Sequence, residues 1–145
     1  MSYIGEEITD AASELGIELI ELSNEEFECI RTNIKKIYAN RPGLFLWEKL
    51  TDRISINDSD AWQYIDEFIG DKESILFFNE DEERKAFVIE NGSDLVAILG
   101  ETSYFEFYIT NKNASYLLVF NHHDYLIASG EAKNWLKTKI DSMNK

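Results

Sequence analysis

Apolar side chains in the first half of the chain recur at intervals of three and four residues, the spacing of amphipathic helices. Each stretch ends at a sequence that cannot continue a helix, either a glycine or the Asn40–Gly43 segment with its proline. The second stretch also begins at a capping sequence, Ser23–Glu26. Helices are therefore predicted at three places, between Ile4 and Leu15, between Asn24 and Ala39, and between Trp62 and Ile69.

The second half changes to short runs of β-branched and aromatic residues separated by turn sequences, which is typical of strands. Ser74–Phe78 and Lys85–Ile89 flank an acidic turn and predict a β-hairpin. Apolar and polar residues alternate over 104–110, which predicts a further strand. Residues 115–120 and 125–128 predict two more strands, and a last helix follows Gly130.

A few stretches permit more than one structure. Ile17–Leu22 is either a strand or an extended connection, Arg53–Asn57 indicates a brief strand, and Leu44–Trp47 is too short to assign. Ser93–Gly100 fits a short capped helix or one arm of a hairpin at Asn91–Gly92, and its apolar spacing favours the helix. The whole chain, residues 1–145, is predicted to be one α+β domain with N-terminal helices followed by a mainly antiparallel sheet and a C-terminal helix.

Charge is unevenly distributed along the chain, whose formal net charge is −14. Residues 1–30 hold nine acids and no Lys or Arg, residues 31–56 have a net charge of +4, residues 57–106 of −11, and residues 107–145 of +2. Such a field repels phosphate backbones and anionic membranes, so neither nucleic acid nor membrane is an expected partner. It speeds encounter with a basic protein, although an acidic surface can also serve solubility alone.

The sequence predicts a cytoplasmic protein. Its apolar stretches are far shorter than the ~20 residues of a membrane-spanning helix. Met1–Glu7 lacks the basic and apolar regions of a secretory signal. The single cysteine, Cys29, can form neither an internal disulfide nor a cysteine-based zinc site, which agrees with a reducing compartment.

Residue types that carry catalysis are sparse. His122 and His123 precede Asp124, but in an extended segment the two imidazoles would point to opposite faces, so we expect a turn stabilised by Asn121 and Asp124 in place of a metal site. Cys29 fits a helical apolar pattern and is interpreted as a packing residue. The chain has neither a nucleophile elbow nor a glycine-rich phosphate motif. No catalytic residue, metal or cofactor is predicted.

Two groups of residues are candidates for binding a protein partner. The first is the acidic turn between the hairpin strands, which is either a solvated tip or a negative surface for Lys and Arg side chains. The second is the polar face of the strand at 104–110, where an exposed Tyr-Glu-Tyr row would combine aromatic anchors with charge, unless a helix covers it. The residues are Glu80, Asp81, Glu82 and Glu83 in the turn, and Tyr104, Glu106 and Tyr108 in the strand.

The segment from Phe105–Ile109 through Tyr116–Asp124 to Gly130 resembles the C-terminal half of small immunity proteins from bacterial polymorphic-toxin systems, specifically uncharacterised members. The resemblance consists of a strand–turn–strand–helix order together with acidity. It implies a cytoplasmic antitoxin that binds and blocks a cognate toxin domain, often a basic nuclease, made by the same cell. No contact residue is carried over, because such families diverge at their binding faces.

The leading hypothesis is thus a non-catalytic inhibitor of a basic protein, with its oligomeric state open. One alternative is a small regulatory or ligand-binding domain whose pocket lies between the sheet and its helices. The other is a metal-dependent hydrolase built on His122, His123 and carboxylates.

Overall fold

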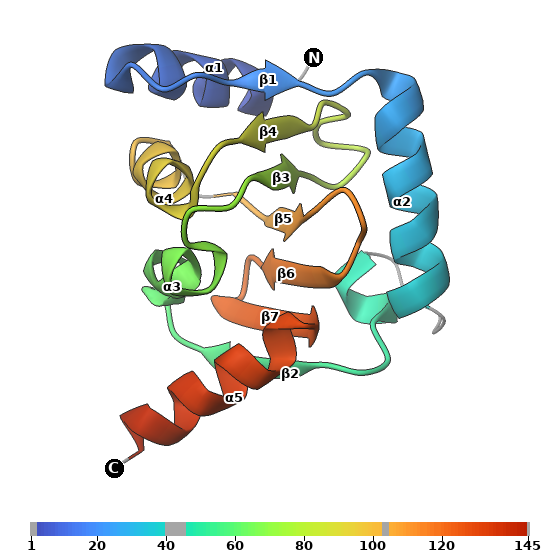
Figure 1. Ribbon diagram of the computed structural model, residues 1–145, viewed down its shortest axis with the longest axis vertical. Coiled ribbons are helices and arrows are strands. Elements are labelled where there is room, and N and C mark those ends of the chain that lie inside the picture. Colours follow the sequence, from blue (N-terminus) through green and yellow to red (C-terminus); the bar gives the residue numbers. More distant parts are fainter. Residues whose placement is uncertain (1–2, 40–45, 103–104, 145) are drawn as a thin grey trace.

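A computed structural model describes residues 3–39, 46–102 and 105–144, which form an α+β fold in three layers (Figure 1). A seven-stranded antiparallel sheet lies in the middle, with strand order β1-β4-β3-β5-β6-β7-β2. Helix α2 covers one face, and α1, α3, α4 and α5 pack against the other. The predicted fold class is confirmed. Within the described ranges, no helix is both long and apolar enough to span a bilayer.

The predicted helices form, but the segment predicted as one helix between Trp62 and Ile69 begins as a 3₁₀ turn and becomes α-helical only at Ile65. Gly16 ends α1 in the left-handed conformation (φ 70°), and the Ser23 hydroxyl accepts a hydrogen bond from the Glu26 backbone amide at the start of α2. Residues 93–100 are helical, as favoured, with the Asn91 side chain as the cap. The α-helices are α1 Ile4–Leu15, α2 Asn24–Tyr38, α3 Ile65–Ile69, α4 Gly92–Gly100 and α5 Ala132–Met143, and two 3₁₀ turns are η1 Leu46–Lys49 and η2 Ala61–Tyr64.

The strands confirm the predicted hairpin and the later strands of a mainly antiparallel sheet, and they resolve two ambiguous stretches. Both edge strands come from the first half of the chain, so β1 pairs with β4 at one edge and β2 with β7 at the other. The strands are β1 Ile20–Glu21, β2 Ile54–Asn57, β3 Ser74–Phe77, β4 Phe87–Ile89, β5 Phe107–Thr110, β6 Tyr116–Phe120 and β7 Tyr125–Gly130.

Alternate residues of the central strands enter two separate hydrophobic cores. On β5, Phe107 and Ile109 pack on the side of α1, α3 and α4, whereas Tyr108 faces α2. Helix α2 contributes Phe27 and Ile34 to that second core. Since both faces of the sheet are covered, its central strands are buried on both sides.

Burial of two tyrosine hydroxyls predicts a loss of stability at alkaline pH. Burial raises the pKa of Tyr108 and of Tyr116 above the ordinary value, with nearby Glu106 and Glu131 adding to the respective shifts. Because the unfolded chain ionises each tyrosine near pH 10 while the folded chain keeps it neutral, stability is fully present below pH 10 and falls above it. The expected loss is about 1.4 kcal/mol per tyrosine per pH unit.

Denaturant unfolding between pH 8 and 11 checks this expectation. The Tyr108→Phe/Tyr116→Phe double variant should be less stable at pH 8, because it lacks the hydroxyl bonds to Asn79 and Thr110, yet lose less stability above pH 10. Equal alkaline slopes for the variant and the native chain would contradict it.

Candidate functional site

The acidic turn after β3 is largely engaged within the molecule. Glu80, Asp81 and Glu82 are exposed, as predicted for the tip of a hairpin. The carboxylate of Glu80 lies 3.0 Å from Arg31 Nη1 and 3.4 Å from Lys35 Nζ, both on α2. The carboxylate of Glu82 accepts a hydrogen bond of 3.0 Å from the Asn79 amide. Two of these three exposed acids are therefore already bound to neighbouring side chains.

Glu83 corrects the prediction of an exposed acid, since only 7% of its surface is accessible. Its Oε1 accepts a hydrogen bond of 2.7 Å from the Gly5 backbone amide in the first turn of α1, and its Oε2 accepts one from the Lys85 amide. Helix α1 has no side-chain cap at Tyr3. Glu83 fills that role from 78 residues away, because a carboxylate complements both the unpaired amides and the positive end of a helix.

The prediction of an exposed Tyr-Glu-Tyr row is wrong at the two positions that the structure describes. Tyr104 lies outside the described residues. Glu106 is 5% exposed and Tyr108 is fully buried. The reason is the position of β5 between β3 and β6 under α2, where an alternating strand has two buried faces. Neither side chain is available to a partner protein.

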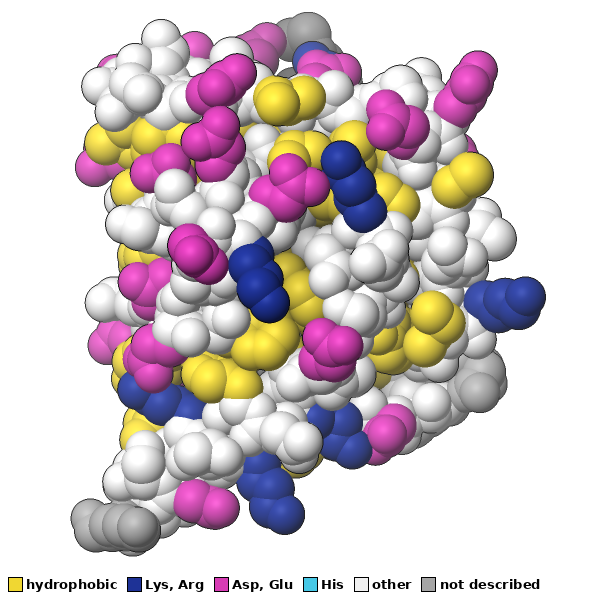
Figure 2. All heavy atoms as spheres, in the orientation of Figure 1, with side chains coloured by type: hydrophobic (Ala, Val, Ile, Leu, Met, Phe, Trp, Pro, Cys, Tyr) yellow, Lys and Arg dark blue, Asp and Glu magenta, His cyan; other side chains and the backbone are white. Residues whose placement is uncertain are grey.

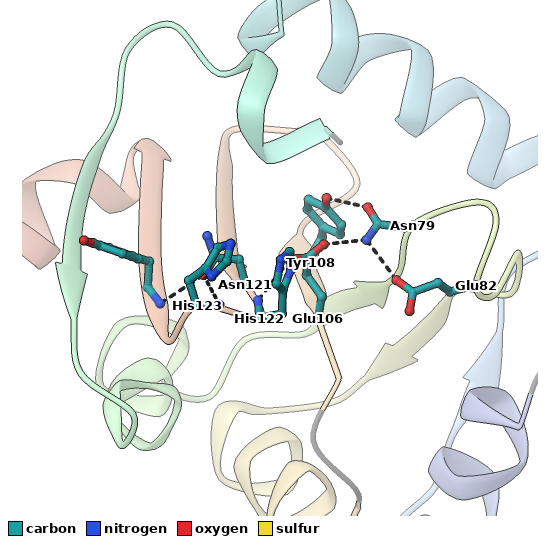
Figure 3. Close-up of polar contacts among 8 residues, drawn as sticks. Asn79, Glu82, Glu106, Tyr108, Asn121, His122 and His123 are labelled. Carbon is teal, nitrogen blue, oxygen red and sulfur yellow. Dashed lines mark hydrogen bonds and ion pairs between the residues drawn. The ribbon is translucent and has the colours of Figure 1, made fainter. Parts of the chain in front are cut away.

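Glu106 and Tyr108 belong to a buried polar network (Figure 3). The Tyr108 hydroxyl donates to Asn79 Oδ1 at 2.6 Å, and Asn79 Nδ2 donates to Glu106 Oε2 at 2.5 Å and to Glu82. The other Glu106 oxygen accepts a bond of 3.1 Å from the His122 backbone amide and lies 2.8 Å from His122 Nδ1. Every oxygen of this buried carboxylate thus has a partner, as burial of charge requires.

The histidine pair lies in a turn, as predicted, with Asn121 Oδ1 accepting from the amides of His123 and Tyr125. The expectation that the two imidazoles point to opposite faces is wrong. Asp124 adopts a positive φ of 65° in the turn, and the ring centroids of His122 and His123 lie 4.0 Å apart. Within the described ranges, no three His, Cys, Asp or Glu side chains group as a metal site.

The interpretation of Cys29 as a packing residue is wrong. Cys29 is exposed on α2. The carboxylate of Glu106 orients the His122 imidazole as it would that of a general base.

A cavity of about 400 Å³ lies between α2, η1 and the end of β3, next to this network. A pocket between the sheet and its helices was one alternative from the sequence, but its residues could not be identified because they come from four separate segments. Arg31, Lys35 and Lys49 supply positive charge to a wall that also holds apolar, acidic and neutral polar side chains. The other lining residues are Leu46, Phe77, Phe78, Asn79, Glu80, Asp81 and Tyr108.

Arg31 is the most constrained of these cations. Its side chain is 9% exposed, and its guanidinium carbon lies 4.3 Å from the centroid of the Phe27 ring. Nη1 pairs with Glu28 at 2.7 Å and with Glu80 at 3.0 Å. Nη2 is buried and has no hydrogen-bond partner among the described residues. A buried donor left unsatisfied costs about 1–3 kcal/mol, and more when charged, so this nitrogen favours an oxygen ligand.

Comparison with known proteins identifies a family whose function is unknown. The model described as "Family of unknown function (DUF6756)" matches residues 2–140, so the chain belongs to this family. No curated protein and no solved structure matches the chain. Any functional conclusion must come from the geometry described above.

The Glu83 cap predicts that the effect of one substitution depends on another. A Cβ at Gly5 would lie 2.4 Å from Glu83 Oε1, so Gly5→Ala displaces the carboxylate and should lower the free energy of unfolding. In a Glu83→Ala background the obstruction is gone. There Gly5→Ala should be stabilising, because alanine forms helices better than glycine by up to about 1 kcal/mol. A double-mutant cycle by denaturant unfolding measures the difference, and additive effects would contradict the cap.

The buried network predicts a large effect from an isosteric change. Glu106→Gln replaces one carboxylate oxygen by an NH₂ group that faces donors from Asn79 or His122. The expected loss is about 2–3 kcal/mol in the free energy of unfolding, because a buried donor is left without an acceptor. Glu90→Gln, at an exposed position, is the matched control and should change stability by less than about 0.5 kcal/mol. Similar values for the two variants would contradict the assigned network.

Proposed function

We propose that this member of the family is a non-catalytic binding protein that neutralises a basic protein partner, as immunity proteins of polymorphic-toxin systems do. The observation that carries the proposal is an acidic stripe on α1, formed by Glu6, Asp10 and Glu14, with exposed apolar side chains beside it in the sequence. The proposed location is the cytoplasm, where a partner made by the same cell would be met.

The acidic stripe follows from helical geometry. Glu6, Asp10 and Glu14 are spaced by four residues, so they lie along one side of α1, and all three are exposed. No Lys or Arg occurs in residues 1–30, which leaves the stripe without a cation on its own helix. In Figure 2, Asp and Glu side chains gather at the upper left, where Figure 1 shows α1.

Folding of the chain favours neither the four-residue spacing of these charges nor the position of Glu14. Like charges four residues apart destabilise a helix by about 0.2–0.5 kcal/mol per pair. Glu14 also lies in the last turn of α1, where a negative charge opposes the helix dipole and basic residues are absent. Glu80, Glu82 and Glu83, by contrast, bind neighbours within the molecule. The stripe therefore replaces the turn after β3 as the proposed acidic contact surface.

Apolar contacts are available on the same segment. Tyr3 is 61%, Leu15 40% and Ile20 51% exposed, and they account for three of the six large exposed hydrophobic side chains among the described residues. A groove of about 310 Å³ between α1 and the β1–β4 edge, lined in part by Ile17 and Glu21, adds a concave surface. Aromatic and aliphatic anchors supply lasting affinity, while acidic side chains raise the rate of encounter.

The test starts with affinity capture from source-cell lysate at low salt, mass spectrometry of bound proteins, and purification of any basic protein found. Association rates are then measured between about 50 and 500 mM salt. The proposal expects a 1:1 complex whose association rate falls as salt rises, and in which the partner's toxic activity is blocked. A partner that is acidic, or that keeps full activity in the complex, contradicts it.

Glu14→Lys separates folding from binding, because it should change them in opposite directions. The variant should gain about 0.5–1 kcal/mol of stability, since lysine attracts Asp10 and complements the helix dipole. Its association with the basic partner should nevertheless slow several-fold. Asp141→Lys makes the same change in net charge at an exposed position of α5, at the other end of the molecule, and should slow association much less (Figure 1). Equal slowing would mean that only net charge matters.

A further inference from the structure

We infer that the cavity between α2 and the end of β3 binds a small molecule through a carboxylate or phosphate group. Such a site is distinct from the proposed protein contact surface, because α2 and α1 cover opposite faces of the sheet (Figure 1). The inference is independent of the proposed function, and each can fail alone.

The local charge of the cavity favours an anionic ligand. The chain has only 14 Lys and Arg against 28 acids, yet three of those cations line this one cavity. The Lys35 side chain is 52% exposed and so can turn toward a ligand. Lys49 forms no ion pair with any described residue. In a protein of net charge −14, such a grouping provides a local attraction for anions.

Arg31 is held in a fixed orientation, and its side chain is nine-tenths buried in the cavity wall. Ring contact with Phe27 and the ion pair with Glu28 fix the plane of the guanidinium. Nη2 has no hydrogen-bond partner among the described residues and retains two donors, but the atom itself is buried, so a ligand reaches it only when neighbouring side chains move. A guanidinium held in this way matches the paired oxygens of a carboxylate or phosphate.

The carboxylate of Glu80 already lies close to two of the cations. Its Oε1 is 3.0 Å from Arg31 Nη1 and 3.4 Å from Lys35 Nζ. The structure thus shows an oxyanion bound by these two side chains. Because Glu80 is half-exposed and its side chain can rotate, a ligand oxyanion would compete with it for the same donors.

Size and lining agree with a small organic anion. A cavity of about 400 Å³ lies within the range of small-molecule sites. Leu46 and Phe77 supply an apolar wall. The Phe77 ring stacks on the ring of Tyr108, with their centroids 5.1 Å apart. The bond from Tyr108 to Asn79 fixes this wall before a ligand arrives.

Thermal unfolding of the full-length protein, at constant ionic strength maintained with sodium chloride, tests the inference. The probes are inorganic phosphate, phenyl phosphate and benzoate, each titrated to millimolar concentrations. The inference expects the melting temperature to rise in a saturable way with at least one probe. A larger effect of phenyl phosphate identifies a phosphate ligand, and a larger effect of benzoate identifies a carboxylate. No rise beyond that in sodium chloride with any probe overturns the inference.

Three variants assign the effect to the cavity. Lys49→Gln should weaken binding of the active probe about tenfold, as expected for loss of one charged hydrogen bond. Glu80→Gln should strengthen it several-fold by removing the internal competitor. Lys36→Gln changes an exposed lysine of α2 that does not line the cavity, so affinity should stay within about twofold of the native value.

Lys49 and Glu80 are not part of the hydrophobic core, so loss of folding should not obscure the result. Equal affinities of the Lys49→Gln and Lys36→Gln variants would overturn the assignment to this cavity. A weaker affinity of Glu80→Gln would also contradict it, because that carboxylate would then support the ligand and not compete with it.

Discussion

The loop between β3 and β4 connects all three layers, because three of its polar side chains bind different elements. Asn79 bonds to Glu106 and to Tyr108 of β5, Glu80 pairs with α2, and Glu83 caps α1. Carboxylates and amides this close to an apolar core are tolerated only when their hydrogen bonds are satisfied. The hydrogen bonds of Asn79 and Glu83 therefore hold α1 and the central sheet relative to one another, and the ion pair of Glu80 adds a contact with α2.

This constraint separates acids that serve folding from acids that remain free. A run of four acidic residues suggests a partner surface when only its charge is considered. In the structure, Glu83 accepts a hydrogen bond from Gly5 and Glu82 accepts one from Asn79. Glu14, by contrast, opposes the dipole of its own helix. A charge that lowers the stability of the fold indicates a functional role more strongly than a charge that raises it.

Most of the fold could be predicted because periodicity and caps are local properties of the sequence. Gly16 and Ser23 ended and began helices where expected, and the hairpin strands paired as predicted. Burial could not be predicted in the same way. Alternation around Tyr108 looks the same whether a strand has one exposed face or two unlike buried faces, and α2, which covers it, lies about 70 residues earlier. The Glu83 cap and the cavity likewise depend on contacts between distant segments.

The same loop determines whether the two proposed sites influence each other. Glu80, which would yield to an anion in the cavity, lies between Asn79 and Glu83, both buried and hydrogen-bonded. Coupling between sites requires an element with two arrangements of similar energy. Movement of the Glu80 side chain leaves both neighbouring anchors in place, and α1, which carries the acidic stripe, is held by the second of them. Occupation of the cavity should therefore leave the α1 surface unchanged, so a small anion and a protein partner would bind independently.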